Sequence, residues 1–167
     1  ENSMKGVVVD TWTMDGALEI YGANLDQYIY QFKWNGSSWD KDTVSSGGSS
    51  MYGVTIGDGN NDGELEVYGA NYDACIYQFK WNSSSWDKDT VGSGGDRMYG
   101  VAVGDGNNDG ELKVYGTNRD YHTYQFKLTH LFPALTHIWP ETGINDISIT
   151  AHIFGNNFLD ISDIKLI

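Results

Sequence analysis

Polar turn clusters divide the chain into short apolar segments in which hydrophobic and polar residues alternate. In one of them Leu65 and Val67 would face one way, while Glu66 and Tyr68 would face the other. A period of two is typical of a β-strand. Four such segments follow one another, separated by stretches rich in Gly, Asn, Asp and Ser. They predict strands at residues 51–56, 64–70, 75–81 and 86–91.

The same pattern recurs at a fixed spacing. Met4, Met51 and Met98 each begin a Met-x-Gly-Val segment, and 51 − 4 and 98 − 51 both equal 47 residues. A constant period of this size indicates an array of similar supersecondary units. We therefore expect an all-β fold of tandem four-stranded antiparallel sheets, arranged like the blades of a β-propeller.

Three repeats are visible, and the third is incomplete. They cover residues 4–50, 51–97 and 98–127, and from Leu128 the sequence departs from the pattern. Propellers close with roughly four to eight blades, so three cannot form a ring. The chain is then a piece of a longer array, a protomer that closes with copies of itself, or an open stack of blades.

An acidic loop links the first two predicted strands of the second repeat. Its oxygen-bearing side chains stand at relative positions 1, 3, 5 and 9 and belong to Asp58, Asn60, Asp62 and Glu66. Glu64 at position 7 offers its backbone carbonyl, and Gly63 permits the sharp turn that aims these groups inward. Calcium takes about six to eight oxygen ligands, whereas magnesium demands a tight octahedron. The loop therefore predicts a Ca²⁺ site, although Asn-Asp-Gly is also a good turn sequence without any metal.

This loop resembles the FG-GAP and VCBS repeats of integrin-like β-propellers, whose loops read Asp-x-Asp-x-Asp-Gly-x-x-Asp. The resemblance covers residues 4–127, with Asn60 and Glu66 in place of two of the aspartates. The third repeat retains the metal positions Asp105, Asn107, Asp109 and Glu111. However, Lys113 places a cation at position 9, so this site should be weaker or empty.

In the first repeat, threonine replaces two of the ligands. Thr11 and Thr13 stand where the aspartate and asparagine belong, and only Asp15 and Glu19 remain. We expect this repeat to have lost the ion.

Each of the first two repeats carries an aromatic hairpin. The tryptophans that should face each other in pairs are Trp34, Trp39, Trp81 and Trp86. They are also candidates for glycan binding, since blade aromatics form carbohydrate-stacking surfaces in lectins with integrin-like propellers. Asn35 and Asn82 begin Asn-x-Ser sequons in the same hairpin loops, so both are candidate N-glycosylation sites.

The net charge and the lack of catalytic motifs exclude several classes of function. The chain has 10 Lys and Arg against 23 Asp and Glu, a net charge of −13, which would repel nucleic acids and anionic membranes and favour a cation such as calcium. No apolar run approaches the roughly 20 residues that span a bilayer. The sequence contains no HExxH, Gly-x-Ser-x-Gly or phosphate-loop motif, so we expect no enzyme and no zinc site. The single Cys75 cannot form an internal disulfide and suits a small core position.

Residues 128–167 have a different composition. Leu135, Pro140, Gly143 and the Gly-Asn-Asn-Phe segment at 155–158 resemble the opening of an IPT/TIG domain, an immunoglobulin-like sandwich. Less than half of such a domain is present. We expect its strands to pair with another chain or with sequence missing here.

These features together predict an extracellular or cell-surface, calcium-binding structural or adhesion module. It would act through contacts with other protein chains and through self-assembly. A lectin-like carbohydrate-binding module is the alternative, followed by an accessory region of a secreted polysaccharide-active enzyme. The chain opens on Glu1 without a basic, apolar leader, so we expect any signal peptide to have been removed.

Overall fold

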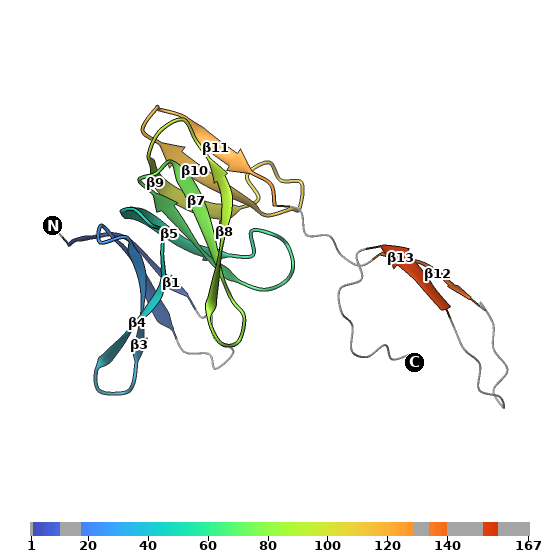
Figure 1. Ribbon diagram of the computed structural model, residues 1–167, viewed down its shortest axis with the longest axis horizontal. Helices are drawn as coiled ribbons and strands as arrows, with labels where there is room; N and C mark the ends of the chain where they lie inside the picture. The colour runs from blue at the N-terminus through green and yellow to red at the C-terminus, as the bar shows by residue number, and fades with distance from the viewer. Residues whose placement is uncertain (1, 11–17, 129–133, 140–151, 157–167) are drawn as a thin grey trace. The chain divides into compact units, whose positions relative to one another are not determined.

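The computed structural model describes residues 2–10, 18–128, 134–139 and 152–156 (Figure 1). In these ranges the chain forms strands and turns and no helix, so the all-β prediction is confirmed there. The described residues accordingly contain no helix long and apolar enough to cross a membrane. Contacts divide the chain into two compact units, residues 1–129 and residues 130–167.

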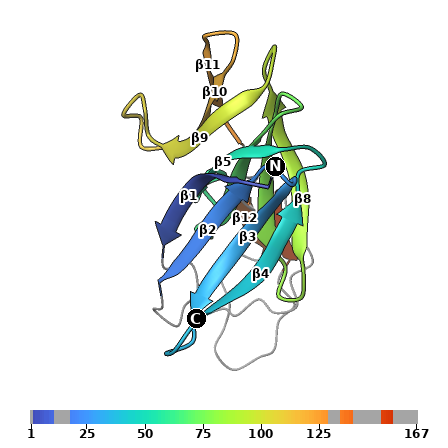
Figure 2. The ribbon, with the colours of Figure 1, turned by 90° about the vertical axis from the view of Figure 1, so that its left-hand side faces the viewer.

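The first repeat forms a four-stranded antiparallel sheet, which we call sheet 1. Its strands are β1 (Met4–Asp10), β2 (Glu19–Asn24), β3 (Tyr28–Trp34) and β4 (Trp39–Ser46). They lie in sequence order, β1-β2-β3-β4, as Figure 2 shows. Short polar turns join β2 to β3 and β3 to β4, which is the connectivity that the predicted turn clusters favour.

The second repeat forms sheet 2 in the same order. Its strands are β5 (Met51–Gly57), β6 (Glu66–Asn71), β7 (Cys75–Trp81) and β8 (Trp86–Ser93). All four strands predicted for this repeat are present. Strand β6 begins at Glu66 and not at residue 64, because residues 64 and 65 still belong to the acidic loop.

The third repeat forms sheet 3, which has three strands within the described residues. They are β9 (Met98–Gly104), β10 (Lys113–Asn118) and β11 (Thr123–Phe126). Strand β10 lies between the other two. Each sheet thus has the first strand of its repeat at one edge, and the loop that follows that strand is the acidic loop.

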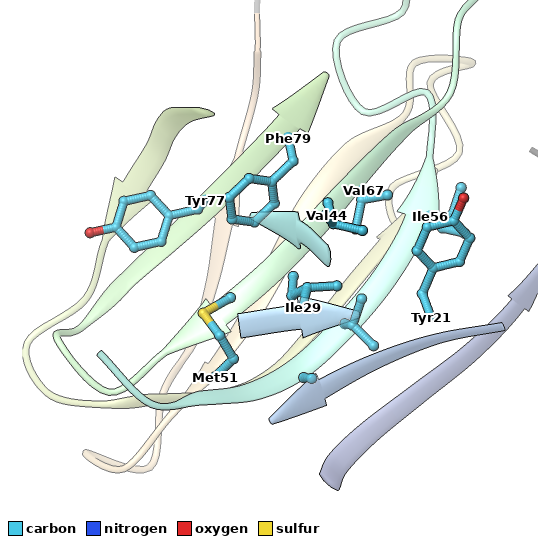
Figure 3. Packing of buried hydrophobic residues seen from close by; sticks show 10 residues of the cluster. Tyr21, Ile29, Val44, Met51, Ile56, Val67, Tyr77 and Phe79 are labelled. Atoms are coloured by element: carbon cyan, nitrogen blue, oxygen red, sulfur yellow. The ribbon is translucent and has the colours of Figure 1, made fainter. Parts of the chain in front are cut away.

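The three sheets pack face to face through apolar side chains. Ile29 of sheet 1 and Met51, Val67 and Phe79 of sheet 2 belong to one buried cluster, whose side chains Figure 3 shows between the two sheets. A second cluster joins sheets 2 and 3; its buried members are Tyr68, Ala70, Ile76, Met98 and Val114. Sheet 2 therefore buries both of its faces, and all six residues of β6 are buried.

A column of glycines brings the edge strands into close contact. A Cβ atom on Gly53 would lie 2.9 Å from the carbonyl oxygen of Tyr99 and 3.1 Å from the Cα of Gly100. A Cβ on Gly6 would meet the backbone of Gly53 at 3.0 Å in the same way. Backbone atoms cannot move aside as a flexible side chain can. Glycine is therefore required where β1, β5 and β9 approach one another.

The second unit is described only by its two strands. Strand β12 (Ala134–Trp139) pairs antiparallel with β13 (His152–Asn156), and Leu135 lies opposite Gly155. The expected motif positions Pro140, Gly143 and Phe158 lie outside the described residues. A two-stranded ladder alone does not identify an immunoglobulin-like sandwich, so that assignment stays a prediction.

The glycine column yields a stability prediction. Gly53→Ala should lower the free energy of unfolding by about 1–3 kcal/mol, because its methyl group would clash with the backbone of β9. Thermal melting followed by circular dichroism measures the change. Gly104→Ala is the matched control, since nothing lies within 4 Å of the new Cβ there. Equal stability of the two variants would contradict the close packing of β5 on β9.

Candidate metal-binding loops

The acidic loop of the second repeat is a turn organised by Asp58. The two oxygens of its carboxylate accept N–H bonds from Asp62, at 2.9 Å, and from Gly63, also at 2.9 Å. Asn61 and Gly63 have positive φ angles of 59° and 89°. Left-handed backbone suits Asn and Gly better than other residues, so this sequence favours the turn locally.

Three of the predicted ligands meet inside this turn. The side-chain amide of Asn60 donates to Asp62 Oδ2 at 2.9 Å and to Glu66 Oε1 at 3.1 Å. Glu66 is fully buried, and its other oxygen accepts a 2.9 Å hydrogen bond from the Tyr68 hydroxyl. Burial raises the pKa of Glu66 to about 7. A buried carboxylate is stabilised when a cation lies beside it.

Lys80, from β7, supplies positive charge to this loop. Its ammonium lies 2.5 Å from Asp62 Oδ2, 3.0 Å from Glu64 Oε2 and 3.8 Å from Glu66 Oε1. Burial acts to raise the pKa of Asp62, but hydrogen bonds from Lys80 and from the backbone of Glu64 outweigh it and lower the pKa. The Lys80 side chain is 38% exposed, so its ammonium can move into solvent without unpacking the core.

The donor set of this loop suits calcium. Carboxylate, amide and carbonyl oxygens are the hard ligands that calcium prefers. Within the described residues, no group of three or more His, Cys, Asp or Glu side chains is gathered as a metal cluster. A calcium shell would therefore need Asn60 to turn its oxygen inward, the carbonyl of Glu64 to join, and Lys80 to withdraw.

The loop of the third repeat has the same backbone but not the same chemistry. Asp105 again accepts N–H bonds from positions 5 and 6 of the loop, Asp109 at 3.0 Å and Gly110 at 2.8 Å. Asn108 and Gly110 have positive φ angles of 57° and 86°, nearly those of Asn61 and Gly63. The second and third loops therefore share the same turn conformation.

Lys113 contacts the oxygens that calcium would use in this third loop. Its ammonium donates to Asn107 Oδ1 at 2.9 Å, to Asp109 Oδ1 at 2.6 Å and to the carbonyl of Glu111 at 3.0 Å. Only 2% of the Lys113 side chain is exposed, and its hydrogen bond holds the pKa of Asp109 well below the usual range. An ammonium at this place does not fit a bound metal ion, which is a physical reason to keep the prediction that the third site is weaker or empty.

The first loop is described only at its end. Thr11, Thr13 and Asp15 lie outside the described residues. Glu19 is buried, with 1% of its surface exposed, and accepts hydrogen bonds of 2.7 Å from both Tyr21 and Gln31. Lys33 lies 2.9 Å from its other oxygen. The carboxylate of Glu19 is thus already neutralised by protein groups.

Sequence reasoning missed the lysines that face these loops. Lys33, Lys80 and Lys127 are spaced by the 47-residue period, and each forms an ion pair with an acidic residue of its own repeat. The sequence did contain a signal for them, because the 47-residue repeat places the three lysines at equivalent positions. Alternation alone could not show it, because the ion pairs depend on the register between the second and third strands.

Asn61 is a second residue that the sequence analysis did not single out. Its side chain reaches sheet 3, accepting a 2.8 Å hydrogen bond from the N–H of Leu112 and donating a 2.9 Å bond to the carbonyl of Leu112. The acidic loop of one repeat is therefore tied directly to the backbone of the next.

The aromatic pairs are placed as predicted. Trp34 and Trp39 have ring centroids 5.4 Å apart, and those of Trp81 and Trp86 are 5.5 Å apart. Trp81 and Trp86 also line a groove of about 860 Å³ between sheets 1 and 2. Polar groups complete its walls, among them Gln31, Asp42 and Thr43 of sheet 1 and Glu64 and Lys80 of sheet 2. Trp34 and Trp39 do not line it.

The two sequons lie at exposed hairpin tips. Asn35 and Asn82 each accept a hydrogen bond from the serine two residues later, Ser37 N–H at 3.0 Å and Ser84 N–H at 3.1 Å. Their exposure suits glycosylation, which stays a prediction. Cys75 is half-buried and packs against the core cluster between sheets 1 and 2, as expected for a small core residue.

No protein-family model matches the chain, and no curated protein matches it. The resemblance to FG-GAP and VCBS repeats therefore depends on the acidic loops and the repeat length alone.

Replacing the buried lysine should create a calcium site. Lys113→Glu gives the third loop the residue that the second loop has at position 9, so the chain should bind one more calcium ion than the wild type. Isothermal titration with CaCl₂ measures the stoichiometry. Lys113→Met is the control: it also removes the ammonium, but it supplies no ligand and should gain no ion. Equal stoichiometry for both variants would contradict the assigned role of Lys113.

Proposed function

We propose that this chain is an extracellular, calcium-binding structural module that acts through contacts with other protein chains and not through catalysis. Its sheets would serve as propeller-type blades. The proposal depends chiefly on one observation: in the second repeat the turn brings Asn60 into hydrogen-bond contact with both Asp62 and the buried Glu66. A divalent ion there would neutralise charge that this strongly acidic chain otherwise leaves in close proximity.

The ion would stiffen the contact between two sheets. Calcium would fix the turn that includes Asn61, and Asn61 holds the backbone of Leu112 in sheet 3 through two hydrogen bonds. A mobile loop loses conformational entropy each time it forms such bonds, whereas a metal-fixed loop has already lost it. Calcium at sheet 2 would therefore strengthen the packing of sheet 3.

Lys80 lowers the calcium affinity that we expect for the second loop. Because Lys80 already neutralises part of the loop, calcium must displace it, which weakens binding. We expect a dissociation constant of about 10⁻⁴–10⁻³ M, the range of extracellular calcium modules. Such a site would be filled outside cells and empty at cytosolic calcium levels. The resemblance to integrin-like repeats supports an extracellular location, where a site of this affinity would be filled.

The calcium prediction concerns thermal stability. The melting temperature of the wild type should rise in millimolar CaCl₂ and fall in EDTA, because the ion binds the folded loop and not the unfolded chain. Asp62→Asn keeps the shape of the side chain but removes its charge and should abolish most of this response. The control is Asp89→Asn, an equal charge change at an exposed position of β8. A wild-type melting curve that ignores both EDTA and calcium would refute the proposal.

A carbohydrate-binding function is the second candidate, and the groove between sheets 1 and 2 is the observation that favours it. Aromatic faces stack on sugar rings, and the polar side chains around Trp86 could hydrogen-bond hydroxyl groups. Gly63 and Glu64 of the calcium loop also line this groove. Glycan binding there would consequently depend on calcium.

Glycan binding is tested by comparing two tryptophans. If the groove is the site, Trp86→Ala should abolish binding on a glycan array, because truncation removes the stacking surface. Trp39→Ala, its counterpart in the first repeat, lies outside the groove and should bind as the wild type does. Circular dichroism must show that both variants are folded. Wild-type binding to glycans that persists in Trp86→Ala would place the site elsewhere.

A further inference from the structure

Each contact between neighbouring sheets uses equivalent residues. The side of sheet 1 that carries Tyr21, Ala23 and Ile29 is covered by the side of sheet 2 that carries Met51 and Ile56. Sheet 2 in turn covers sheet 3 with Tyr68, Ala70 and Ile76, which lie 47 residues further along the chain. Sheet 2 thus meets the preceding sheet with one side and the following sheet with the other.

Sheet 1 has no preceding sheet among the described residues. Met4, Val7 and Val9 are the counterparts of Met51, Val54 and Ile56, and we call them the open face of sheet 1. Their exposed fractions are 46%, 69% and 54%, whereas those of the counterparts are 0%, 7% and 8%. The same apolar surface that sheet 2 buries is therefore exposed on sheet 1.

Sheet 3 exposes the complementary side. Thr117 and Thr123 stand at the positions of Ala70 and Ile76, and we call them, with Gly100, the open face of sheet 3. Both threonines are exposed, while Ala70 and Ile76 are fully buried. Gly100 stands at the position that Gly6 and Gly53 occupy in the other two sheets, and a Cβ on it would lie 2.8 Å from Thr117 Oγ1 of its own sheet. Sheet 3 thus retains the backbone shape needed to receive a further sheet.

Two local features of the contacts within the chain, an isoleucine over a glycine and an asparagine bound to a backbone, recur on the two open faces. At each existing contact an isoleucine fits over a glycine of the next sheet: Ile29 Cδ1 would be 2.8 Å from a Cβ on Gly69, and Ile76 Cδ1 would be 3.2 Å from a Cβ on Gly116. Gly22 is the corresponding glycine of sheet 1. Thr123 is the side chain that would fit over it.

The second feature is the asparagine that joins sheets 2 and 3. Asn108 has almost the same φ angle as Asn61, 57° against 59°, and is exposed. Its target in a following sheet would be the residue equivalent to Leu112. In sheet 1 that residue is Leu18, which is 59% exposed. One molecule therefore carries both the asparagine, Asn108, and its backbone target, Leu18. The two belong to repeats 3 and 1, which sheet 2 separates.

We propose that sheet 3 of one copy docks on the open face of sheet 1 of a second copy, repeating the contact that joins consecutive sheets within the chain. Asn108 of the first copy would hydrogen-bond the backbone of Leu18 in the second. This inference rests on the proposed structural function and deepens it by naming the partner. Because the two surfaces differ, the contact is head-to-tail, and it either closes into a ring or continues as a filament.

The contact between copies is weaker than those within the chain. Threonine replaces alanine and isoleucine at positions 117 and 123, so less apolar surface is buried and two hydroxyl groups lose water. Assembly is consequently reversible and depends on protein concentration. Two copies supply six sheets, a number within the roughly four to eight that close a propeller.

The test is sedimentation velocity of the full chain across micromolar concentrations. The mass of the wild type should increase with concentration. Val7→Asp should raise the dissociation constant at least about tenfold, because docking would bury an unpaired charge. Thr123→Ile should lower it by roughly tenfold by restoring the buried methyl groups. Thr90→Asp, which adds the same charge on an exposed part of β8, should behave as the wild type does.

Hydrogen exchange of β1 identifies the occupant of the open face. Protection that increases with protein concentration supports docking of a second copy, whether the sedimenting species is a closed dimer or a growing filament. A wild type that stays monomeric overturns the proposal, as does protection independent of concentration, which would mean that residues 130–167 cover the face. Calcium titration of the same samples tests the metal site separately, so failure of either proposal is distinguishable from failure of the other.

Discussion

A sheet that is apolar on both faces must be covered on both faces, and this constraint underlies the whole repeat unit. Strand β6 shows it most clearly: Val67 packs toward sheet 1, Tyr68 and Ala70 pack toward sheet 3, and the whole strand is buried. Burying a large apolar side chain contributes about 1.5–3 kcal/mol. A single repeat could not gain this free energy alone, so the sheets are stable only as neighbours in a stack.

In each repeat a lysine balances the negative charge of the acidic residues, but the three arrangements differ. Each repeat places acidic side chains after its first strand, and each supplies positive charge from within the protein. In the first repeat Lys33 pairs with Glu19, in the second an exposed Lys80 spans several oxygens, and in the third a buried Lys113 makes three hydrogen bonds. Unlike the buried Lys113, the partly exposed Lys80 can withdraw into solvent without disturbing the core, which is why calcium is proposed at the second loop and not at the third.

Much of the fold could be predicted from the sequence because it depends on local pattern. Alternation and the 47-residue period identified the strands of the second repeat, and hairpin symmetry placed Trp81 opposite Trp86. The start of β6 was wrong by two residues, since an apolar Leu65 inside the loop looks like a strand residue. The roles of Lys80 and Asn61 depend on register and on contacts between sheets, which no local pattern contains. The arrangement of the sheets as a closed propeller stays a proposal for the same reason.

Because the glycine column repeats with the 47-residue period, a chain of this kind could gain or lose whole repeats. Gly6, Gly53 and Gly100 give the two junctions between sheets the same close backbone approach. A gene segment encoding one whole period could be duplicated or deleted, and the flanking sheets would still find matching surfaces. Adding or removing whole units would keep the stacking, whereas an insertion within a strand would shift the register of its sheet.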